Sequence, residues 1–279
     1  MEIQARAEAF RQLHDRPGVF VVPNPWDAGS AKLLESLGFE ALATTSAGYA
    51  FSLGRPDAAA AVDRDETLAN VRAIVDATSL PVSADLENGF GDDPQACADT
   101  IRMAVAAGLV GGSIEDATGR TGDPIYPFAL AVERVAAAVA AVRALPFPFV
   151  LTARAENLIT GRPDLTDTIR RLEAFAAAGA DVLYAPGLTT RDAINSVVRA
   201  VAPKPVNVVM GLSGATFSLA ELGDLGVKRV SLGSSLARAA LGALLRASRE
   251  VRDSGTFTFS RDAMPYTELN SLFERNWKD

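Results

Sequence analysis

Residues 81–116 of the chain are PVSADLENGFGDDPQACADTIRMAVAAGLVGGSIED, and they contain one complete repeat of a strand–helix–strand pattern. A short apolar run, 81–87, leads into the glycine-rich turn 88–91. An alanine-rich stretch of helical character follows, and a second apolar run covers 108–116. No signal for a β-hairpin lies between the two runs. We therefore predict two parallel strands joined by a crossover helix.

The same alternation continues along the rest of the chain. The predicted strands cover 18–23, 40–46, 81–87, 108–116, 148–156, 180–187, 204–210 and 227–233. Eight such units at intervals of roughly 30 residues are what a (β/α)₈ TIM-type barrel requires, and this α/β fold is our prediction. An open doubly wound sheet is the alternative. Such a sheet usually carries a glycine-rich phosphate turn after its first strand, where this chain has PNPWD (23–27).

The chain is expected to form one barrel domain over residues 1–279, with 234–279 as a helical extension. The extension carries more apolar side chains than barrel closure needs: Leu241, Leu244, Leu245, Leu269, Leu272, Phe273 and Trp277. These side chains would pack on a partner subunit or, alternatively, cap the floor of the barrel. Two long connections, 47–64 and 117–127, follow strand ends, where long loops often act as lids.

Composition limits the classes of function. The net charge is −7 and no basic run occurs, which argues against nucleic acid as a partner. No apolar run approaches the roughly 18 residues that a membrane span needs. The single cysteine, Cys97, rules out an intrachain disulfide and fits a cytoplasmic protein. The only histidine, His14, lies in the predicted N-terminal helix, which argues against a Ser-His-Asp triad and a histidine-ligated zinc site.

Polar side chains gather at the predicted carboxyl ends of the strands, the face on which barrel enzymes carry their active sites. With Asp57 from the loop after the second strand, they are Ser46, Asp85, Glu87, Glu115, Asp116, Arg154, Glu156, Tyr184 and Asn207. Asp85 and Glu87 are two residues apart on one predicted strand, so both carboxylates should point to the same side. Crowded carboxylates raise each other's pKa or require a cation. An all-oxygen site suits Mg²⁺, with Mn²⁺ as an alternative.

Four segments resemble motifs of the isocitrate lyase/phosphoenolpyruvate mutase superfamily, and the resemblance spans about residues 18–240. They are PNPWDAGSAKLLESLGFEALATTSAGYAFSLGRPD (23–57), SADLENGFG (83–91), GGSIED (111–116) and LTARAEN (151–157). The resemblance implies a barrel with Mg²⁺ at the carboxyl ends of its strands. It also implies a C-terminal helix exchanged between subunits, and hence a homodimer or homotetramer.

The resemblance further implies a role for each acidic residue. Asp85 would bind the metal directly, and Glu87 and Glu115 would act in its shell, largely through water. Asp57 would lie close to both metal and substrate. We therefore predict Asp85, Glu87 and Glu115 as the metal site, and Arg154, Asp57 and Glu115 as the catalytic residues.

On the substrate side, the resemblance implies that Ser46, Ala47 and Gly48 hold a carboxylate or oxyanion through backbone and hydroxyl groups. Arg154 would clamp the same anion. We add Tyr184 and Asn207 as further substrate contacts because both lie at predicted strand ends.

One departure from the family matters for the reaction. The lyases of this family carry a Lys-Lys-Cys-Gly-His loop after the fourth strand, and its cysteine supplies a proton to the departing carbanion. This chain has ATGRTGD at 117–123, without cysteine, lysine or histidine. The difference argues against cleavage of isocitrate or methylisocitrate by that mechanism.

The resulting hypothesis is a Mg²⁺-dependent lyase or hydrolase that acts on a small 2-oxo acid such as oxaloacetate or 2-oxoglutarate. The reaction would be C–C cleavage, hydrolytic cleavage or decarboxylation through a metal-stabilised enolate. P–C chemistry, of the phosphonopyruvate hydrolase or phosphoenolpyruvate mutase type, is the alternative. A third hypothesis is that the protein binds a 2-oxo acid with little turnover.

Overall fold

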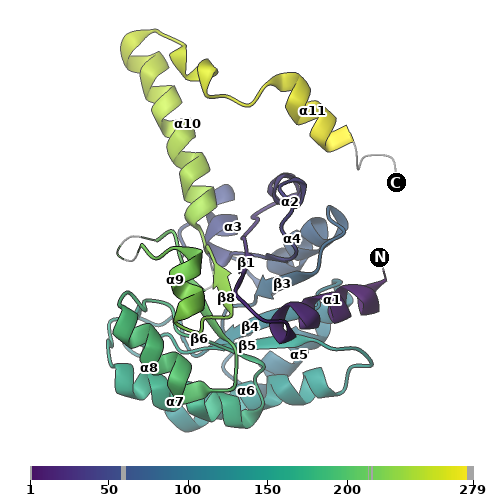
Figure 1. Cartoon of the computed structure of the whole chain (residues 1–279), viewed down its shortest axis with the longest axis vertical. Coiled ribbons are helices and arrows are strands. Elements are labelled where there is room, and N and C mark those ends of the chain that lie inside the picture. The colour runs from purple at the N-terminus through teal and green to yellow at the C-terminus, as the bar shows by residue number, and fades with distance from the viewer. Residues whose placement is uncertain (1, 58–60, 213, 215, 275–279) are drawn as a thin grey trace.

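The computed structural model describes residues 2–57, 61–212, 214 and 216–274, and its centre is a nearly closed parallel barrel (Figure 1). The strands are β1 (Phe20–Val22), β2 (Leu42–Ala43), β3 (Val82–Asp85), β4 (Gly111–Glu115), β5 (Val150–Arg154), β6 (Val182–Tyr184), β7 (Val206–Val209) and β8 (Arg229–Ser231). Their order is β1-β8-β7-β6-β5-β4-β3-β2, and the Ala43 amide donates to the Pro23 carbonyl (3.1 Å) across the remaining gap. All eight predicted strands and the barrel are confirmed, and the open sheet is excluded.

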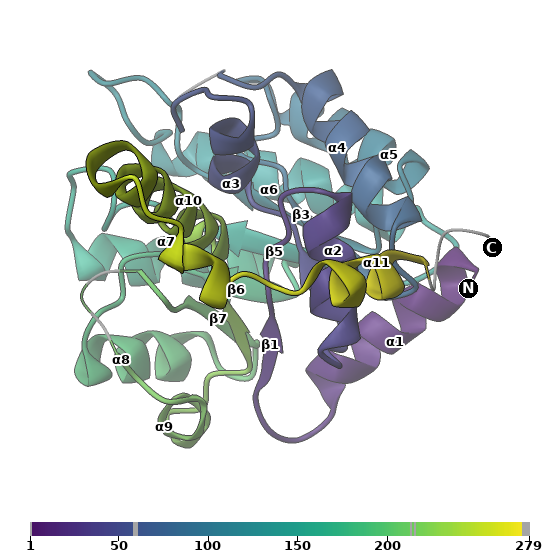
Figure 2. The same ribbon diagram turned by 90° about the horizontal axis from the view of Figure 1, so that it is seen from above.

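Helices surround the barrel on the outside (Figures 1 and 2). They are α1 (Ile3–Asp15), α2 (Ala28–Ser36), α3 (Ser46–Ser52), α4 (Arg64–Asp76), α5 (Pro94–Ala106), α6 (Phe128–Arg143), α7 (Leu165–Ala178), α8 (Arg191–Val201), α9 (Leu219–Asp224), α10 (Ser235–Ser254) and α11 (Tyr266–Glu274), with a short 3₁₀ turn at Thr258–Arg261. No helix in the described ranges is both long and apolar enough to cross a membrane.

The hydrophobic core has two parts because a barrel strand alternates its side chains between the interior and the helices. The larger part lies between strands and helices and includes Val82, Leu86 and Ile101. Cys97 belongs to it as a fully buried thiol, and a Cβ at Gly89 (φ +78°) would lie only 2.9 Å from its Sγ. The cysteine therefore acts as a small apolar side chain, as its position in a helix suggests.

Helix α1 closes the floor of the barrel. Its buried side chains, Phe10 among them, pack with Phe20 and Val182 from the strands. His14 lies edge-on between the rings of Phe10 and Phe20, at centroid distances of 4.8 and 5.0 Å. The histidine is thus a packing residue far from the carboxyl ends of the strands, which agrees with its exclusion from the catalytic set.

The C-terminal extension leaves the barrel at its other end. Helix α10 projects away from the body, and α11 turns back to lie over α2, where Phe273 comes within 3.8 Å of the Cβ position of Gly29 (Figures 1 and 2). Leu244 and Leu245 on α10 are 63% and 50% exposed. The alternative in which the extension caps the floor is therefore wrong, because α1 closes that end. Trp277, one of the predicted apolar contacts, lies outside the described residues.

Candidate active site at the carboxyl ends of the strands

Arg154 lies at the end of β5 and contacts three carboxylates. Its Nη1 donates to Asp85 Oδ1 (2.8 Å), its Nη2 is 3.0 Å from Glu115 Oε2, and its Nε donates to Glu156 Oε1 (2.9 Å). The side chains of Arg154, Asp85 and Glu115 are only 14–16% exposed. One guanidinium cannot neutralise three carboxylates, so this buried cluster keeps an excess of negative charge when all three are ionised.

Asp85 is the carboxylate that the site keeps ionised. Ser46 donates to its Oδ2 through Oγ (2.8 Å) and through the backbone amide (3.4 Å). Burial opposes ionisation of Asp85, but the charge of Arg154 and the donors of Ser46 outweigh it and lower the pKa of the carboxyl. Ser46 occupies this position because it begins α3, directly after the N-cap Thr45.

Glu87 lies beyond the end of β3. It has φ +46°, a left-handed conformation that is uncommon for a residue other than glycine. We predicted that Glu87 and Asp85 point to the same side because both lie on one strand. This reason is wrong, because β3 ends at Asp85 and Glu87 is not part of the strand. The turn itself directs Glu87 into the cavity. Burial, and then the charge of Asp85, raise the pKa of Glu87 to about 7.

Two further acids in the site have raised pKa values. Burial raises the pKa of Glu115 well above its ordinary value, although Arg154 acts in the opposite direction. Burial, followed by the charge of Asp85, also raises the pKa of Asp57. Carboxyls that resist ionisation in this way are those that an added cation would stabilise most.

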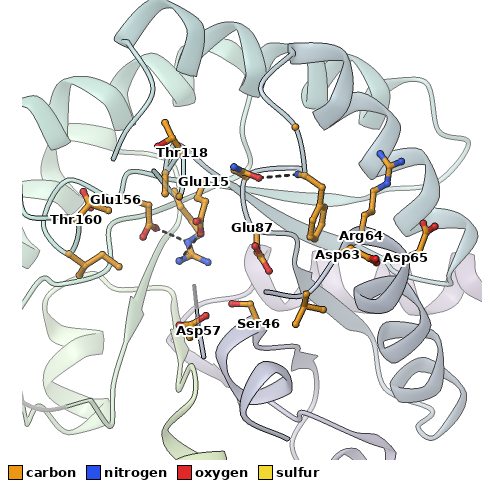
Figure 3. Close-up of a pocket in the computed structure, with 18 residues that line it drawn as sticks. Ser46, Asp57, Asp63, Arg64, Asp65, Glu87, Glu115, Thr118, Glu156 and Thr160 are labelled. Carbon is orange, nitrogen blue, oxygen red and sulfur yellow. Dashed lines mark hydrogen bonds and ion pairs between the residues drawn. The ribbon is translucent and has the colours of Figure 1, made fainter. Parts of the chain in front are cut away.

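Except for Asp85, which borders a smaller inner cavity, these residues border a cavity of about 690 Å³ at the carboxyl ends of the strands. Figure 3 shows Ser46, Asp57, Glu87, Glu115 and Glu156 directed toward one another around its floor. Six of the lining side chains are carboxylic acids and two are arginines: Asp57, Asp63, Asp65, Glu87, Glu115 and Glu156 against Arg64 and Arg154. The cavity therefore favours cations over anions, unless a bound cation changes its charge.

The predicted metal residues fit a hydrated hard cation better than a dehydrated one. In the described part of the chain, no group of three or more His, Cys, Asp or Glu side chains lies close enough to enclose a metal ion. Both oxygens of Asp85 already accept hydrogen bonds. Mg²⁺ keeps several waters and uses one or two carboxylates, so Asp85 as a direct ligand, with Glu87 and Glu115 acting through water, matches this all-oxygen set.

Of the predicted substrate contacts, Ser46, Ala47, Arg154, Tyr184 and Asn207 border an inner cavity that continues from the site into the barrel. The ring of Tyr184 also packs against Arg154, whose Cζ is 5.2 Å from the ring centroid. Gly48 differs from the other five. The amide of Gly48 donates to Thr45 Oγ1 (3.2 Å), and neither cavity is lined by Gly48. Because its amide is occupied, Gly48 is not available as an anion donor in this conformation.

Asp116 does not join the acidic cluster, although its strand-end position suggested it. Its Oδ2 is 3.0 Å from Arg171 Nη1, and its Oδ1 accepts from the amide of Glu156 (2.8 Å). Glu156 is the third carboxylate on Arg154; the sequence placed it at a strand end, but it was not among the predicted catalytic, metal or substrate residues. The spacing Arg154-x-Glu156, which repeats that of Asp85-x-Glu87, was the available signal for it.

Arg134, in the middle of α6, is a further residue near the site that we did not predict from the sequence. Its Nη1 donates to the carbonyls of Gly91 (2.6 Å) and Asp92 (2.5 Å), its Nη2 donates to the Asn88 carbonyl, and its Cζ lies 4.0 Å from the ring centroid of Tyr126. Tyr126 in turn donates to Asp92 Oδ1 (2.6 Å). Arg134 thus joins the turn after β3 to the loop after β4. An arginine in a helix gives no sign of this in sequence.

The chain is similar to known proteins over nearly its whole length. The family model for phosphoenolpyruvate phosphomutase matches residues 10–252. A protein from Burkholderia cenocepacia J2315, described only as a lyase or mutase, is 63% identical in its crystal structure, with a TM-score of 0.95 and coverage of 97% and 96% of the two chains. Oxaloacetate decarboxylase from Paraburkholderia xenovorans is 31% identical over 89% of this chain and 83% of its own. The structure of oxaloacetate acetylhydrolase with 3,3-difluorooxalacetate is 26% identical, with a TM-score of 0.87 and coverage of 98% and 94%.

Proposed function

The chain belongs to the isocitrate lyase/phosphoenolpyruvate mutase superfamily, and on that premise we propose that it is a divalent-metal-dependent enzyme cleaving a C–C bond of a small 2-oxo dicarboxylate. Oxaloacetate is the first substrate to test, because one similar protein is an oxaloacetate decarboxylase and another is oxaloacetate acetylhydrolase. We further propose Mg²⁺ as the metal, Mn²⁺ as its substitute, and the cytoplasm as the location.

The observation that carries this proposal is the charge of the cavity. Arg154 is already shared among Asp85, Glu115 and Glu156, so little of its charge is left for an anionic substrate. A 2-oxo dicarboxylate brings two more negative charges into the same space. A divalent cation at Asp85, Glu87 and Glu115 would supply positive charge toward the carboxylate and 2-oxo oxygens of the substrate. Metal dependence is therefore expected from electrostatics as well as from family membership.

The residues of the chain would then orient the substrate and stabilise developing charge. Loss of the C4 carboxylate from oxaloacetate leaves negative charge on the 2-oxo oxygen of the pyruvate enolate, and addition of water at C2 in hydrolysis puts negative charge on the same oxygen before the C2–C3 bond breaks. Arg154 and the Ser46 hydroxyl lie where they would face that charge. Asp57 borders the same cavity, and its raised pKa makes its carboxylate a stronger base than an ordinary aspartate, which suits a group that exchanges a proton with the substrate.

Decarboxylation and hydrolysis of oxaloacetate give different products. Decarboxylation consumes a proton and yields pyruvate and CO₂, whereas hydrolysis consumes water and yields oxalate, acetate and a proton. Loop 117–127 carries no cysteine, lysine or histidine, so a thiol proton donor of the lyase type is not available there. We therefore propose decarboxylation or hydrolysis of oxaloacetate as the reaction, rather than cleavage of isocitrate or methylisocitrate.

The test is product analysis by NMR with purified protein, oxaloacetate and Mg²⁺, alongside an EDTA-treated sample and phosphonopyruvate as a second substrate. Metal-dependent formation of pyruvate or oxalate above the spontaneous rate supports the proposal. The Asp85→Asn variant is the matched control, since it keeps the shape of the side chain. Turnover of phosphonopyruvate alone would instead assign the P–C alternative. Tight binding without turnover of either compound would assign the binding-protein alternative.

We also propose that the extension mediates assembly into a homodimer or homotetramer. The exposed leucines of α10 form an apolar surface that the barrel of the same chain does not cover. Surfaces of this kind are typical of contacts between subunits.

A further inference from the structure

The interior of this barrel is unusually polar at mid-height. Barrels are normally filled by layers of large branched apolar side chains. Here the strands direct inward a set of polar side chains that are nearly all buried: Ser83, Thr152, Asn207, Arg229 and Ser231. With several of these residues in its wall, an inner cavity of about 170 Å³ continues from the candidate active site down to Arg229.

Arg229 is a buried cation without an anionic partner. Arg229 is the first residue of β8, and it is 6% exposed. Arg154 and Arg171 each form ion pairs with carboxylates, but Arg229 forms none within the described residues. Burial lowers the pKa of Arg229 to about 10, which still leaves the guanidinium charged at neutral pH. A charge buried in this way normally has a counter-charge.

In the part of the chain that the structure describes, the groups that accept hydrogen bonds from Arg229 are all neutral. Nε donates to Asn207 Oδ1 (2.8 Å) and Nη2 to Thr152 Oγ1 (2.8 Å), while Nη1 lies 3.4 Å from His14 Nε2. The Nδ1 of His14 must carry its proton, because it lies 2.8 Å from the Phe10 carbonyl, which can only accept. Burial, and then the charge of Arg229, lower the pKa of His14 to about 3, so the ring is neutral and its Nε2 is an acceptor that supplies no charge.

The guanidinium also has donors to spare. Arginine carries five N–H groups, and the three contacts above leave one on each terminal nitrogen without an acceptor among the described residues. Arg229 borders the inner cavity, so the open volume in which an anion could accept from these donors lies beside this residue. Ser231 Oγ, which accepts from Asn207 Nδ2 (2.9 Å), borders the same cavity and has a hydroxyl proton to donate.

We infer that the lower part of the inner cavity binds a small monovalent anion, the size of a halide ion or of one carboxylate group, with Arg229 as its counter-charge and Ser231 as a second donor. The upper part is unsuitable because Asp57 and Asp85 border it and would repel an anion. The inference does not depend on the reaction proposed above. A free halide and a carboxylate of the substrate present the same chemistry to Arg229, so the experiment must separate them.

The first experiment uses the wild-type protein in crystals grown without halide and soaked in sodium bromide. Anomalous diffraction at the bromine edge should place a bromide beside the Arg229 guanidinium. A second soak adds oxalate. Displacement of the bromide by oxalate would identify a carboxylate as the natural occupant, whereas binding of both together would identify a halide site. Water alone in the cavity at high bromide would overturn the inference.

The second experiment measures thermal unfolding against bromide concentration, with ionic strength held constant by sodium gluconate, whose anion is too large for the cavity. Binding to the folded state should raise the midpoint along a saturating curve. Arg229→Gln should weaken bromide binding by about tenfold to a hundredfold, the factor of one charge-assisted hydrogen bond. Arg229→Lys should retain most of the effect because it keeps the charge. Equal stabilisation of the Arg229→Gln variant would mean an adventitious ion only and would also overturn the inference.

Discussion

Arg154 Nη1 lies 2.8 Å from Asp85 Oδ1, so one ion pair connects the end of β5 to the end of β3 across the intervening β4. Glu115 at the end of β4 contacts the same guanidinium at 3.0 Å. Three neighbouring strands therefore share one cation at the floor of the cavity. From this arrangement we predict how substitution of each residue in the cluster changes metal binding and the stability of the fold.

Replacing Asp85 by Asn should abolish metal binding without unfolding the protein. The amide keeps the shape of the side chain but removes the charge that a divalent cation requires, while Arg154 retains two carboxylate partners. The melting temperature should fall, because the lowered pKa of Asp85 means that the folded site stabilises its charge, but the remaining carboxylate partners of Arg154 limit the loss. Isothermal titration with Mn²⁺ should show a loss of affinity of at least about a hundredfold, the upper end of the effect seen for outer-shell changes. Unchanged Mn²⁺ affinity would exclude Asp85 as a ligand.

Replacing Arg154 by Gln should destabilise the fold. Removing one partner of a buried ion pair leaves uncompensated charge and typically costs about 3–5 kcal/mol. Part of this cost will be relieved by protonation, because Glu115 and Glu156 already have raised pKa values. The free energy of unfolding in urea at pH 7.5 should therefore fall more than at pH 5. Arg102→Gln is the control, since Arg102 pairs with Asp99 on the surface and such pairs contribute little. Equal losses in the two variants would contradict a buried role for Arg154.

The metal-free protein should become less stable as pH rises from about 4.5 to about 7. Glu87 has a pKa of about 7 in the folded protein against an ordinary value of 4.5, so the folded state binds more protons than the unfolded state in this window. The free energy of unfolding then decreases with rising pH. Glu115, whose pKa is also raised, acts in the same direction, and Asp85, whose pKa is lowered, acts in the opposite direction below its ordinary value of 3.8.

Urea unfolding across this pH range checks the prediction. Glu87→Gln should reduce the slope because it removes the titrating group. Saturating Mg²⁺ should reduce it as well, by favouring the ionised carboxylate. A wild-type slope that survives unchanged in Glu87→Gln would assign the effect to other residues.

Arg134 should control the turn that carries Glu87. Arg134→Met removes the buried guanidinium that donates to three carbonyls, those of Asn88, Gly91 and Asp92. We expect a loss of about 1.5–3 kcal/mol in the free energy of unfolding, the range for a hydrogen bond that involves a charged group. Mn²⁺ affinity should also fall, since Glu87 and Phe90 hold left-handed conformations that need this support. Tyr126→Phe isolates one link of the network, and it should lower Mn²⁺ affinity less than Arg134→Met. A stability loss with unchanged Mn²⁺ affinity would limit Arg134 to a structural role.

The exposed leucines of α10 should be required for assembly. Leu244→Glu combined with Leu245→Glu should reduce the mass measured by light scattering to that of a single chain, 29.3 kDa. Charges placed in an apolar contact cannot be buried without large cost. Leu37→Glu is the matched control, because Leu37 at the end of α2 is 74% exposed and lies outside the extension. A wild-type protein of 29.3 kDa would refute the proposed oligomer.

The sequence by itself determined the barrel. Alternating apolar runs and helical patterns fix the period of each element, and parallel pairing follows because no hairpin turn separates the strands. The same reasoning placed Asp85, Glu115 and Arg154 at one end of the barrel, since the carboxyl ends of parallel strands meet on one face. For these three residues, the position along the strand was sufficient to predict that they lie in the candidate site.

Only the tertiary structure decided how the polar side chains pair. Glu156 rather than Asp116 completes the contacts of Arg154, Glu87 reaches the cavity through a left-handed turn, and Arg134 supports that turn from a distant helix. Arg229 likewise looks like an ordinary strand residue until its burial and its neutral partners are seen. The physical reason is that hydrogen bonds and ion pairs depend on distances of a few ångströms between segments remote in sequence. Hydrophobic periodicity, by contrast, is a local property that each segment carries by itself.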